Sequence, residues 1–271
     1  MKQQIYFAHA NGFPSPCYRK FFSYLSSHYD IRYVDKVGHD TEYPVTDNWD
    51  YLAQELIFNL ESTYTRPVFG LGHSLGGVLH YIAANKRPDL YHGVIMLDAP
   101  VLSHSKSMVV RMMKWFGIID KITPAGRTKH RKNSWSDAQE AVNYLKERPL
   151  FANFDPDCLN DYVEHGMQHD ANGIHLAFNR EIEYDIYRTL PHNLNSYRRR
   201  RVVPMGLLYG NSTNVVRKHD RKYMHDHLHI QLLDTEGGHL FPFEHPEQAA
   251  KDTETLIKSL MLKNVLAKAL V

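Results

Sequence analysis

The chain has 271 residues and a mass of 31.5 kDa, which is enough for one large α/β domain with an insertion and too little for several independent domains. It has 43% apolar residues, 23% charged residues and a net charge of +2, so it gives no reason to expect a nucleic-acid partner. The two cysteines, Cys17 and Cys158, are far apart in the chain and argue against a disulfide framework. Because no apolar run is long enough to cross a bilayer and no secretory signal is present, we expect a soluble, cytoplasmic protein.

Short apolar runs alternate with longer segments of helical period, which is the pattern of a mostly parallel sheet flanked by helices. The sequence therefore predicts an α/β fold with about six strands, near residues 4–8, 31–34, 68–71, 93–97, 203–209 and 228–233. Helices are expected at about residues 18–27, 48–64, 75–86, 215–225 and 246–270. Apolar residues recur along the last helix at intervals that can cover the sheet, namely Leu256, Ile257, Leu260, Val265, Leu266 and Leu270.

The alternation breaks between residues 101 and 201, which have helical periodicity and no convincing strand. We predict that this segment is a helical cap inserted into a core formed by residues 1–100 and 202–271. Within it, residues 107–119 carry Met and aromatic side chains that either line an apolar entrance or pack on neighbouring helices. The basic run Arg198–Arg201 is interpreted as a solvated linker.

The strongest motif is Gly72-His73-Ser74-Leu75-Gly76, which follows an apolar strand and opens a helix. In such a turn a serine is held in a strained conformation above the sheet, and the two flanking glycines avoid a collision between side chains. The N-terminal amides of the following helix point toward the same place and can stabilise negative charge. This context predicts that Ser74 is a nucleophile.

A serine hydroxyl needs a neighbouring base, which is generally an imidazole. Among the 18 histidines, His239 stands out because it lies in Gly237-Gly238-His239, directly after the last predicted strand. It is therefore expected at the carboxyl edge of the sheet, where Ser74 also lies and where catalytic groups gather. We predict that His239 is the general base.

Hydrolysis through such a serine also needs backbone donors for the developing oxyanion. The loop His9-Ala10-Asn11-Gly12-Phe13 follows the first predicted strand, and its small residues let amides approach a substrate. We expect one donor from Asn11, with Phe13 as the alternative. The second donor is expected from the amide of Leu75.

These segments and Leu97-Asp98-Ala99-Pro100 occur in the chain order of the α/β-hydrolase superfamily. Over nearly its whole length, the chain resembles the small bacterial capped serine hydrolases of that superfamily. The resemblance implies a triad of nucleophile, acid and histidine. In most members the acid follows the strand after the cap, and this chain has Asn214 there.

Asp98 is favoured as the acid because it ends the strand that follows the serine helix, a position from which some lipase-like members supply theirs. Asn214 is the alternative position, although an amide cannot stabilise an imidazolium as an anion does. Asp220 and Asp234 are the remaining candidates.

The substrate pocket is predicted to be shaped by residues near the three catalytic segments and on the cap, namely His9, Phe13, His73, Trp115 and Phe241.

No cofactor is expected, because the serine turn lacks the lysine of a phosphate loop. The histidines of His225-Asp226-His227-Leu228-His229 would share one face of an extended segment, but no further ligand accompanies them, so no metal is expected either.

Together these features predict a carboxylesterase that cleaves a small or medium apolar ester, its small-molecule partner, through an acyl-enzyme intermediate. The same site would also suit a lactonase, a thioesterase, a carbon–carbon hydrolase, or an acyltransferase or perhydrolase. Outside the enzymes, the alternative is a hydrolase-like protein that binds a small molecule without turnover. The sequence leaves the oligomeric state open.

Overall fold

The computed structural model describes residues 2–170, 173–197 and 203–269, with side chains as far as residue 263. The linker predicted at Arg198–Arg201 lies outside the described residues, as do the side chains of Val265, Leu266 and Leu270.

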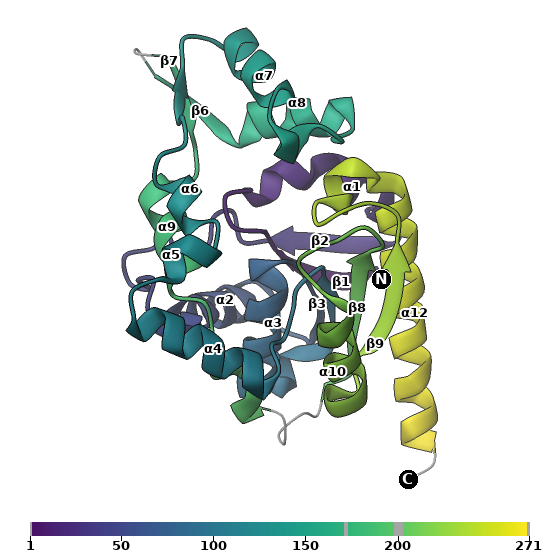
Figure 1. Cartoon of the computed structure of the whole chain (residues 1–271). Coiled ribbons are helices and arrows are strands. Elements are labelled where there is room, and N and C mark those ends of the chain that lie inside the picture. Colours follow the sequence, from purple (N-terminus) through teal and green to yellow (C-terminus); the bar gives the residue numbers. More distant parts are fainter. Residues whose placement is uncertain (1, 171–172, 198–202, 270–271) are drawn as a thin grey trace.

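The centre of the molecule is a sheet of six strands that all run parallel (Figure 1). Their order is β2-β1-β3-β4-β8-β9, so the chain starts near one edge and finishes at the other. The bounds are β1 (Gln3–Ala8), β2 (Tyr29–Tyr33), β3 (Val68–His73), β4 (Tyr91–Leu97), β8 (Met205–Gly210) and β9 (Gln231–Thr235). The predicted six-stranded α/β fold is confirmed.

Helices cover both faces of this sheet. One face carries α1 (Arg19–Leu25) and α12 (Pro246–Ala269). The opposite face carries α2 (Asp50–Thr63), α3 (Leu75–Lys86) and α10 (Lys218–Leu228). The shorter core elements are η1 (Ser15–Tyr18), η2 (Asp47–Trp49), η3 (Pro88–Leu90) and α11 (Phe241–Glu244).

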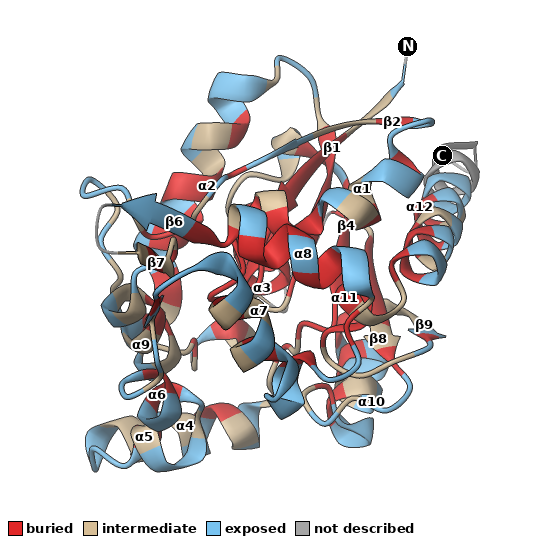
Figure 2. Ribbon diagram, turned by 90° about the horizontal axis from the view of Figure 1, so that it is seen from above, coloured by how far each residue is buried: buried red, intermediate tan, exposed pale blue. Residues whose placement is uncertain are grey.

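Each strand supplies both layers of the core, because successive side chains of a strand point to opposite faces. Ile5 and Phe7 pack in the layer under α1 and α12, whereas Tyr6 and Ala8 pack in the layer under α2 and α3. Viewed from above, Figure 2 shows the buried residues concentrated on the strands and on the inward sides of the helices. A sheet buried on both faces explains why its strands read as continuous apolar runs.

A long insertion separates β4 from β8. It contains α4 (His104–Trp115), α5 (Ile119–Ile122), α6 (Ala125–Thr128), β5 (Ser134–Trp135), α7 (Ala138–Lys146), η4 (Pro149–Phe151), α8 (Pro156–His165), β6 (Met167–Asp170), β7 (Gly173–Leu176), α9 (Arg180–Arg188) and η5 (Leu194–Tyr197). Three of its helices begin at side-chain caps, in which Asp137, Asp155 and Asn179 accept hydrogen bonds from amides of the first turn.

The expectation that this insertion has no strand is wrong. Strands β5, β7 and β6 form a small antiparallel sheet. They have only two to four residues each, and β6 buries only Met167, so they carry no alternation of apolar and polar residues for sequence analysis to detect.

The insertion lies over loops that follow strands of the main sheet. Asn11, after β1, donates from Nδ2 to the carbonyl oxygen of Glu183 at 2.9 Å. The amide of Asp155 donates to the carbonyl oxygen of Phe243, after β9, also at 2.9 Å. The insertion thus covers the carboxyl edge of the sheet, where α/β proteins place their sites.

None of the helices that the structure describes combines the length and apolar character needed to span a bilayer.

Candidate active site

Ser74 occupies the sharp turn between β3 and α3, with φ 50° and ψ −110°. A Cβ atom on Gly72 would lie 2.3 Å from the backbone carbon of Gly76, and a Cβ atom on Gly76 would lie 2.0 Å from the carbonyl oxygen of Ala8. Only glycine fits at either position, because real Cβ atoms do not approach that closely. Ser74 is partly exposed whereas its neighbours His73 and Leu75 are buried, so the turn presents the serine.

Asp98 and His239 meet at the carboxyl edge of the sheet. His239, on the loop after β9, donates from Nδ1 to Oδ2 of Asp98 at 2.7 Å. Asp98 directly follows β4 and is fully buried, with φ 43°. Its carboxylate also accepts hydrogen bonds from the hydroxyl of Thr213 at 2.6 Å and the amide of Gly210 at 3.3 Å. Because Nδ1 of His239 faces the carboxylate, Nε2 is the nitrogen that can take a proton from a nucleophile.

The turn after β8, where most family members carry the acid, has no carboxylate facing His239. It instead supplies a hydrogen-bond donor to Asp98. Thr213, which precedes Asn214, donates to Asp98, and no hydrogen bond within the described part of the chain joins Asn214 to His239. Asp220 pairs with Lys106 at 2.8 Å. Of the positions considered for the acid, Asp98 is therefore the one in contact with the imidazole.

The expected oxyanion donors lie on two segments that are joined by a hydrogen bond. The amide of Gly76 donates to the carbonyl oxygen of His9 at 3.1 Å, so the start of α3 is tied to the loop after β1. The alternative donor, Phe13, uses its amide to close a turn onto Ala10 at 3.0 Å. Phe13 thus cannot offer the same amide to a substrate, which favours Asn11.

His9 was expected in the substrate pocket, but the structure buries its ring completely. Nε2 accepts from the amide of Val37 at 2.8 Å, and Nδ1 donates to the carbonyl oxygen of Ala10 at 2.8 Å. Burial lowers the pKa of His9 to about 4, so the ring is neutral near pH 7. The residue holds the loops after β1 and β2 together.

His73 is also buried completely rather than exposed to a pocket. Its Nε2 donates to the carbonyl oxygen of His239 at 2.9 Å, so Nδ1 carries no proton and accepts from the hydroxyl of Tyr18 at 2.7 Å. The Tyr18 oxygen in turn accepts from the amide of Ala10 at 3.2 Å. Burial keeps the pKa of His73 well below its usual value, which maintains the neutral ring that this chain of bonds requires.

This chain of hydrogen bonds links three segments that are distant in the sequence. It runs from the loop after β1, through η1 and the residue before Ser74, to the loop that carries His239. A second bond holds the same loop, from the amide of Gly238 to Oε2 of Glu244 at 2.6 Å. Sequence analysis missed Tyr18, Thr213 and Glu244, for which no motif gives a signal.

The remaining pocket predictions divide into two groups. Phe241 is fully buried, and Phe13 packs among aromatic side chains of α8, α11 and the neighbouring loops, namely Phe151, Phe154, Tyr162 and Phe243. Trp115 instead lies on α4 with 83% of its surface exposed. The sequence did not indicate this exposure, because apolar composition does not tell which way a helix turns its apolar face.

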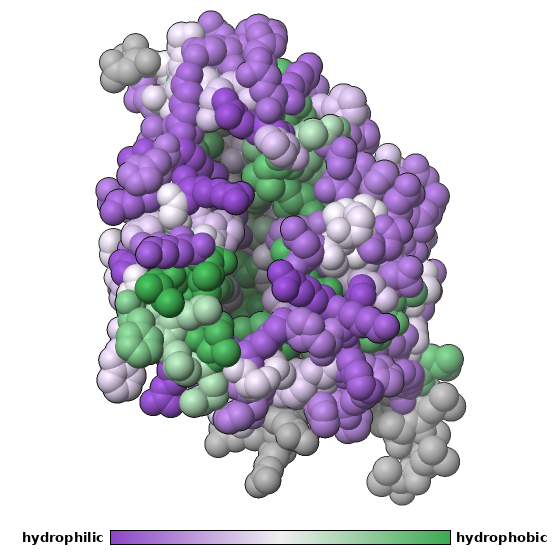
Figure 3. Space-filling model, viewed as in Figure 1, coloured by the Kyte–Doolittle hydropathy of each residue, from purple (hydrophilic) through white to green (hydrophobic). Residues whose placement is uncertain are grey.

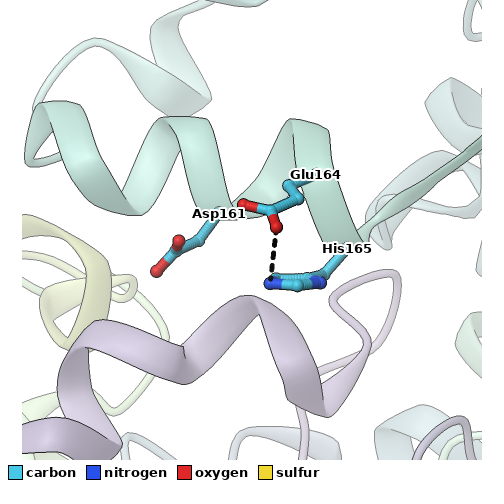
Figure 4. A group of neighbouring side chains, drawn as sticks. All are labelled: Asp161, Glu164 and His165. Carbon is cyan, nitrogen blue, oxygen red and sulfur yellow. Dashed lines mark ion pairs between the residues drawn. The ribbon is translucent and has the colours of Figure 1, made fainter.

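Among the described residues, one group of side chains has the spacing of a metal site, namely Asp161, Glu164 and His165 on α8, whose ligand atoms lie within 4.8 Å of one another. Figure 4 shows Glu164 pairing with His165 while Asp161 points away from both. Asp161 instead forms an ion pair with Arg19, and a cation already there opposes metal binding.

The expectation that residues 225–229 are extended is wrong, because α10 continues to Leu228. Its last turn therefore directs alternate histidines to different sides of the helix.

The chain matches the model of the alpha/beta hydrolase family over residues 5–252. Among solved structures, it resembles E-2-(acetamidomethylene)succinate hydrolase with a TM-score of 0.77 and 20% identity, over 95% of this chain and 91% of that one. It also resembles a marine microorganism esterase (TM-score 0.67, 14% identity, 94% and 95% covered) and the enol-lactonase from Burkholderia xenovorans LB400 (0.64, 12%, 95% and 92%). No curated protein matches it in sequence.

Proposed function

Because this chain belongs to the α/β-hydrolase family, we propose that it is a serine hydrolase that cleaves a small or medium apolar carboxylic ester. The observation that carries the proposal is the 2.7 Å hydrogen bond between His239 and Asp98, beside the strained turn at Ser74. A serine in such a turn, with an imidazole oriented by a buried carboxylate, is the arrangement that activates a hydroxyl.

In the proposed reaction, Oγ of Ser74 attacks the ester carbonyl while Nε2 of His239 takes its proton. The amides of Asn11 and Leu75 donate to the oxyanion of the tetrahedral intermediate. The imidazolium then protonates the departing alcohol, which leaves the acyl group on Ser74. A water molecule, deprotonated by His239, attacks this acyl-enzyme and releases the carboxylic acid, which restores the serine.

Asp98 acts by holding His239 in one tautomer and by stabilising the imidazolium that forms during each half of the reaction. The hydroxyl of Thr213 and the amide of Gly210 keep the carboxylate in position. A protein that only binds a small molecule has no need of this pair, so the contact between Asp98 and His239 weighs against that alternative.

We propose that the insertion, residues 101–201, is a cap that supplies much of the pocket. The aromatic cluster around Phe13 joins residues of the insertion to the loop that carries Asn11. An apolar wall beside the oxyanion donors favours an apolar acyl or alcohol group.

The test is the hydrolysis of p-nitrophenyl butyrate by wild type, Ser74→Ala and the matched control Ser62→Ala, whose serine is exposed on α2. We expect Ser74→Ala to lose at least about 10³-fold in kcat and to lose labelling by a fluorophosphonate, while Ser62→Ala keeps both. Full turnover by Ser74→Ala would refute the proposal. Parallel assays with a thioester and a lactone identify the preferred acyl donor.

A further inference from the structure

The outward side of α4 and α5 carries a group of apolar side chains that the protein leaves uncovered. We define this α4–α5 face by its exposed members Met108, Met112, Trp115, Phe116, Ile118 and Ile122. Trp115 is 83% exposed and Phe116 68% exposed. Figure 3 shows an apolar patch over these two helices, next to a hollow in the surface that is itself partly apolar. Large exposed apolar patches mark interaction sites.

Helix α4 directs polar side chains toward the rest of the protein and apolar side chains toward solvent, which is the reverse of an ordinary surface helix. Its inward contacts are polar: Lys106 pairs with Asp220 at 2.8 Å, and Ser107 accepts from Asn195 at 2.9 Å. Lys114 reaches inward to Asp47. A surface helix normally buries its apolar stripe and exposes its charges. Here the polar side anchors the helix, so the apolar side is available to something outside the chain.

The charges around the α4–α5 face favour an anionic partner. Residues 104–132 contain eight Lys and Arg and one acidic residue, Asp120. Four of these cations, namely Lys106, Lys114, Arg131 and Lys132, form ion pairs with acidic side chains outside this segment. Arg111, Lys121 and Arg127 are exposed. Apolar and aromatic side chains flanked by cations are the combination with which a helix lies in the headgroup region of an anionic bilayer.

We propose that the α4–α5 face docks on a lipid surface that contains anionic headgroups. A second copy of this chain fits less well, because a two-fold contact would bring the basic surroundings of one face against those of the other. In the proposed arrangement Trp115 and Phe116 enter the interfacial layer, while Arg111, Lys121 and Arg127 approach the headgroups. The docking requires no hydrolysis.

The fluorescence of Trp115 provides a direct measurement. The chain has three tryptophans, and the other two, Trp49 and Trp135, are each 4% exposed. A change of emission on contact with vesicles therefore reports on Trp115. We expect a blue shift and protection from a water-soluble quencher with vesicles of 70% phosphatidylcholine and 30% phosphatidylglycerol, and much weaker effects with phosphatidylcholine alone.

Co-sedimentation with the same vesicles, using Ser74→Ala so that hydrolysis plays no part, tests which residues bind. We expect the double change Met112→Asp and Ile122→Asp to weaken binding at least about 10-fold. Phe58→Asp is the matched control, because Phe58 is 54% exposed on α2, outside the α4–α5 face, and it should bind as the parent does. Circular dichroism checks that each variant is folded.

A second variant, Arg111→Glu with Lys121→Glu, keeps the apolar side chains and should lose the preference for phosphatidylglycerol. Absence of binding of the folded parent to anionic vesicles would overturn the proposal. So would a concentration-dependent dimer, measured by light scattering, that the change at Met112 and Ile122 abolishes without any effect on vesicle binding. Because no arm of this experiment measures turnover, its failure is distinguishable from failure of the proposed hydrolase.

Discussion

The carboxyl edge of the sheet buries polar side chains, whereas the outward side of α4 exposes apolar side chains. At the sheet edge, Asp98 and His73 are fully buried, and each makes hydrogen bonds to groups from other segments. On α4, Trp115 faces outward and Lys106 reaches inward. Burying a polar group costs free energy unless the group has a hydrogen-bond partner. Proteins also rarely expose a large apolar surface without a binding partner for it. Each departure from the usual pattern therefore marks a part of the molecule with a specific task.

The largest effect is expected from breaking the buried pair at the sheet edge. Asp98→Asn should keep the fold and lower kcat for p-nitrophenyl butyrate by about 10⁴-fold, because an amide neither fixes the imidazole tautomer nor stabilises imidazolium. Asn214→Ala is the control and should stay within about 2-fold of wild type, since it makes no contact with His239 in the described structure. The opposite ranking of the two variants would place the acid at the turn after β8.

A second prediction concerns a buried carboxyl of the core that has no cationic partner among the described residues. Glu55, on α2, accepts from the amide of Gly38 at 2.8 Å, and burial raises its pKa from 4.5 to about 7. Because the folded pKa exceeds the unfolded one, the ionised form is penalised only in the folded state. Glu55 therefore lowers the free energy of unfolding by an increasing amount as the pH rises from about 4.5 to 7, and by a constant amount above pH 7.

Glu55→Gln keeps an acceptor for Gly38 and removes this cost. At pH 8 we expect the free energy of unfolding to rise by up to about 3 kcal/mol, with little change at pH 4, in denaturant titrations at both values. Glu61→Gln on the same helix alters an exposed ion pair with Arg87 and should change stability by less than about 1 kcal/mol. Equal effects of Glu55→Gln at the two pH values would show that its carboxyl does not titrate in this range.

A smaller effect is expected from Tyr18, which joins the loop after β1 to His73. Tyr18→Phe leaves the buried Nδ1 of His73 without its donor, so the bond from His73 to His239 is held less firmly. We expect kcat to fall about 10-fold with KM nearly unchanged, and stability to fall by about 1–3 kcal/mol. Tyr24→Phe, at an exposed position on α1, should alter neither. A loss of stability without any loss of kcat would limit Tyr18 to a structural role.

The smallest effect is expected from a change on the outward side of α4. Trp115→Ala should change the free energy of unfolding by less than about 0.5 kcal/mol and leave hydrolysis of a water-soluble ester unaltered, because the side chain contributes little to the folded interior. Thermal unfolding and steady-state kinetics check both. A large loss of stability would mean that Trp115 is packed in solution, and the contrast between the two regions would disappear.

The parts of the fold that were predicted correctly are those in which local pattern and tertiary burial agree. Helix α3 runs from Leu75 to Lys86, as expected, because the serine turn marks its start. Strand β9 begins at Gln231 rather than near residue 228, since α10 continues to Leu228 and a left-handed residue, His229, ends it. A sequence of alternating histidines resembles a strand, but the position at which α10 ends determines where β9 begins.

The site was partly predictable for a related reason. Ser74 and His239 lie in short glycine-containing motifs that can be recognised in the sequence, whereas the contacts of Tyr18 and Thr213 depend on side chains that are distant in the sequence. No periodicity reports such contacts. The burial of His9 and His73 could not be predicted, because the sequence does not distinguish an exposed histidine from one that is buried with both ring nitrogens hydrogen-bonded.

The insertion between β4 and β8 also affects how the enzyme is made. Ser74 and Asp98 precede it, whereas Gly210, Thr213 and His239 follow it, and 141 positions separate Asp98 from His239. A ribosome adds about 5–20 residues per second, so a growing chain carries its serine for roughly 8 to 33 s before the histidine exists. Under the proposed mechanism, the nascent chain is therefore catalytically silent during that interval, and it becomes competent only when β8 and β9 join the sheet.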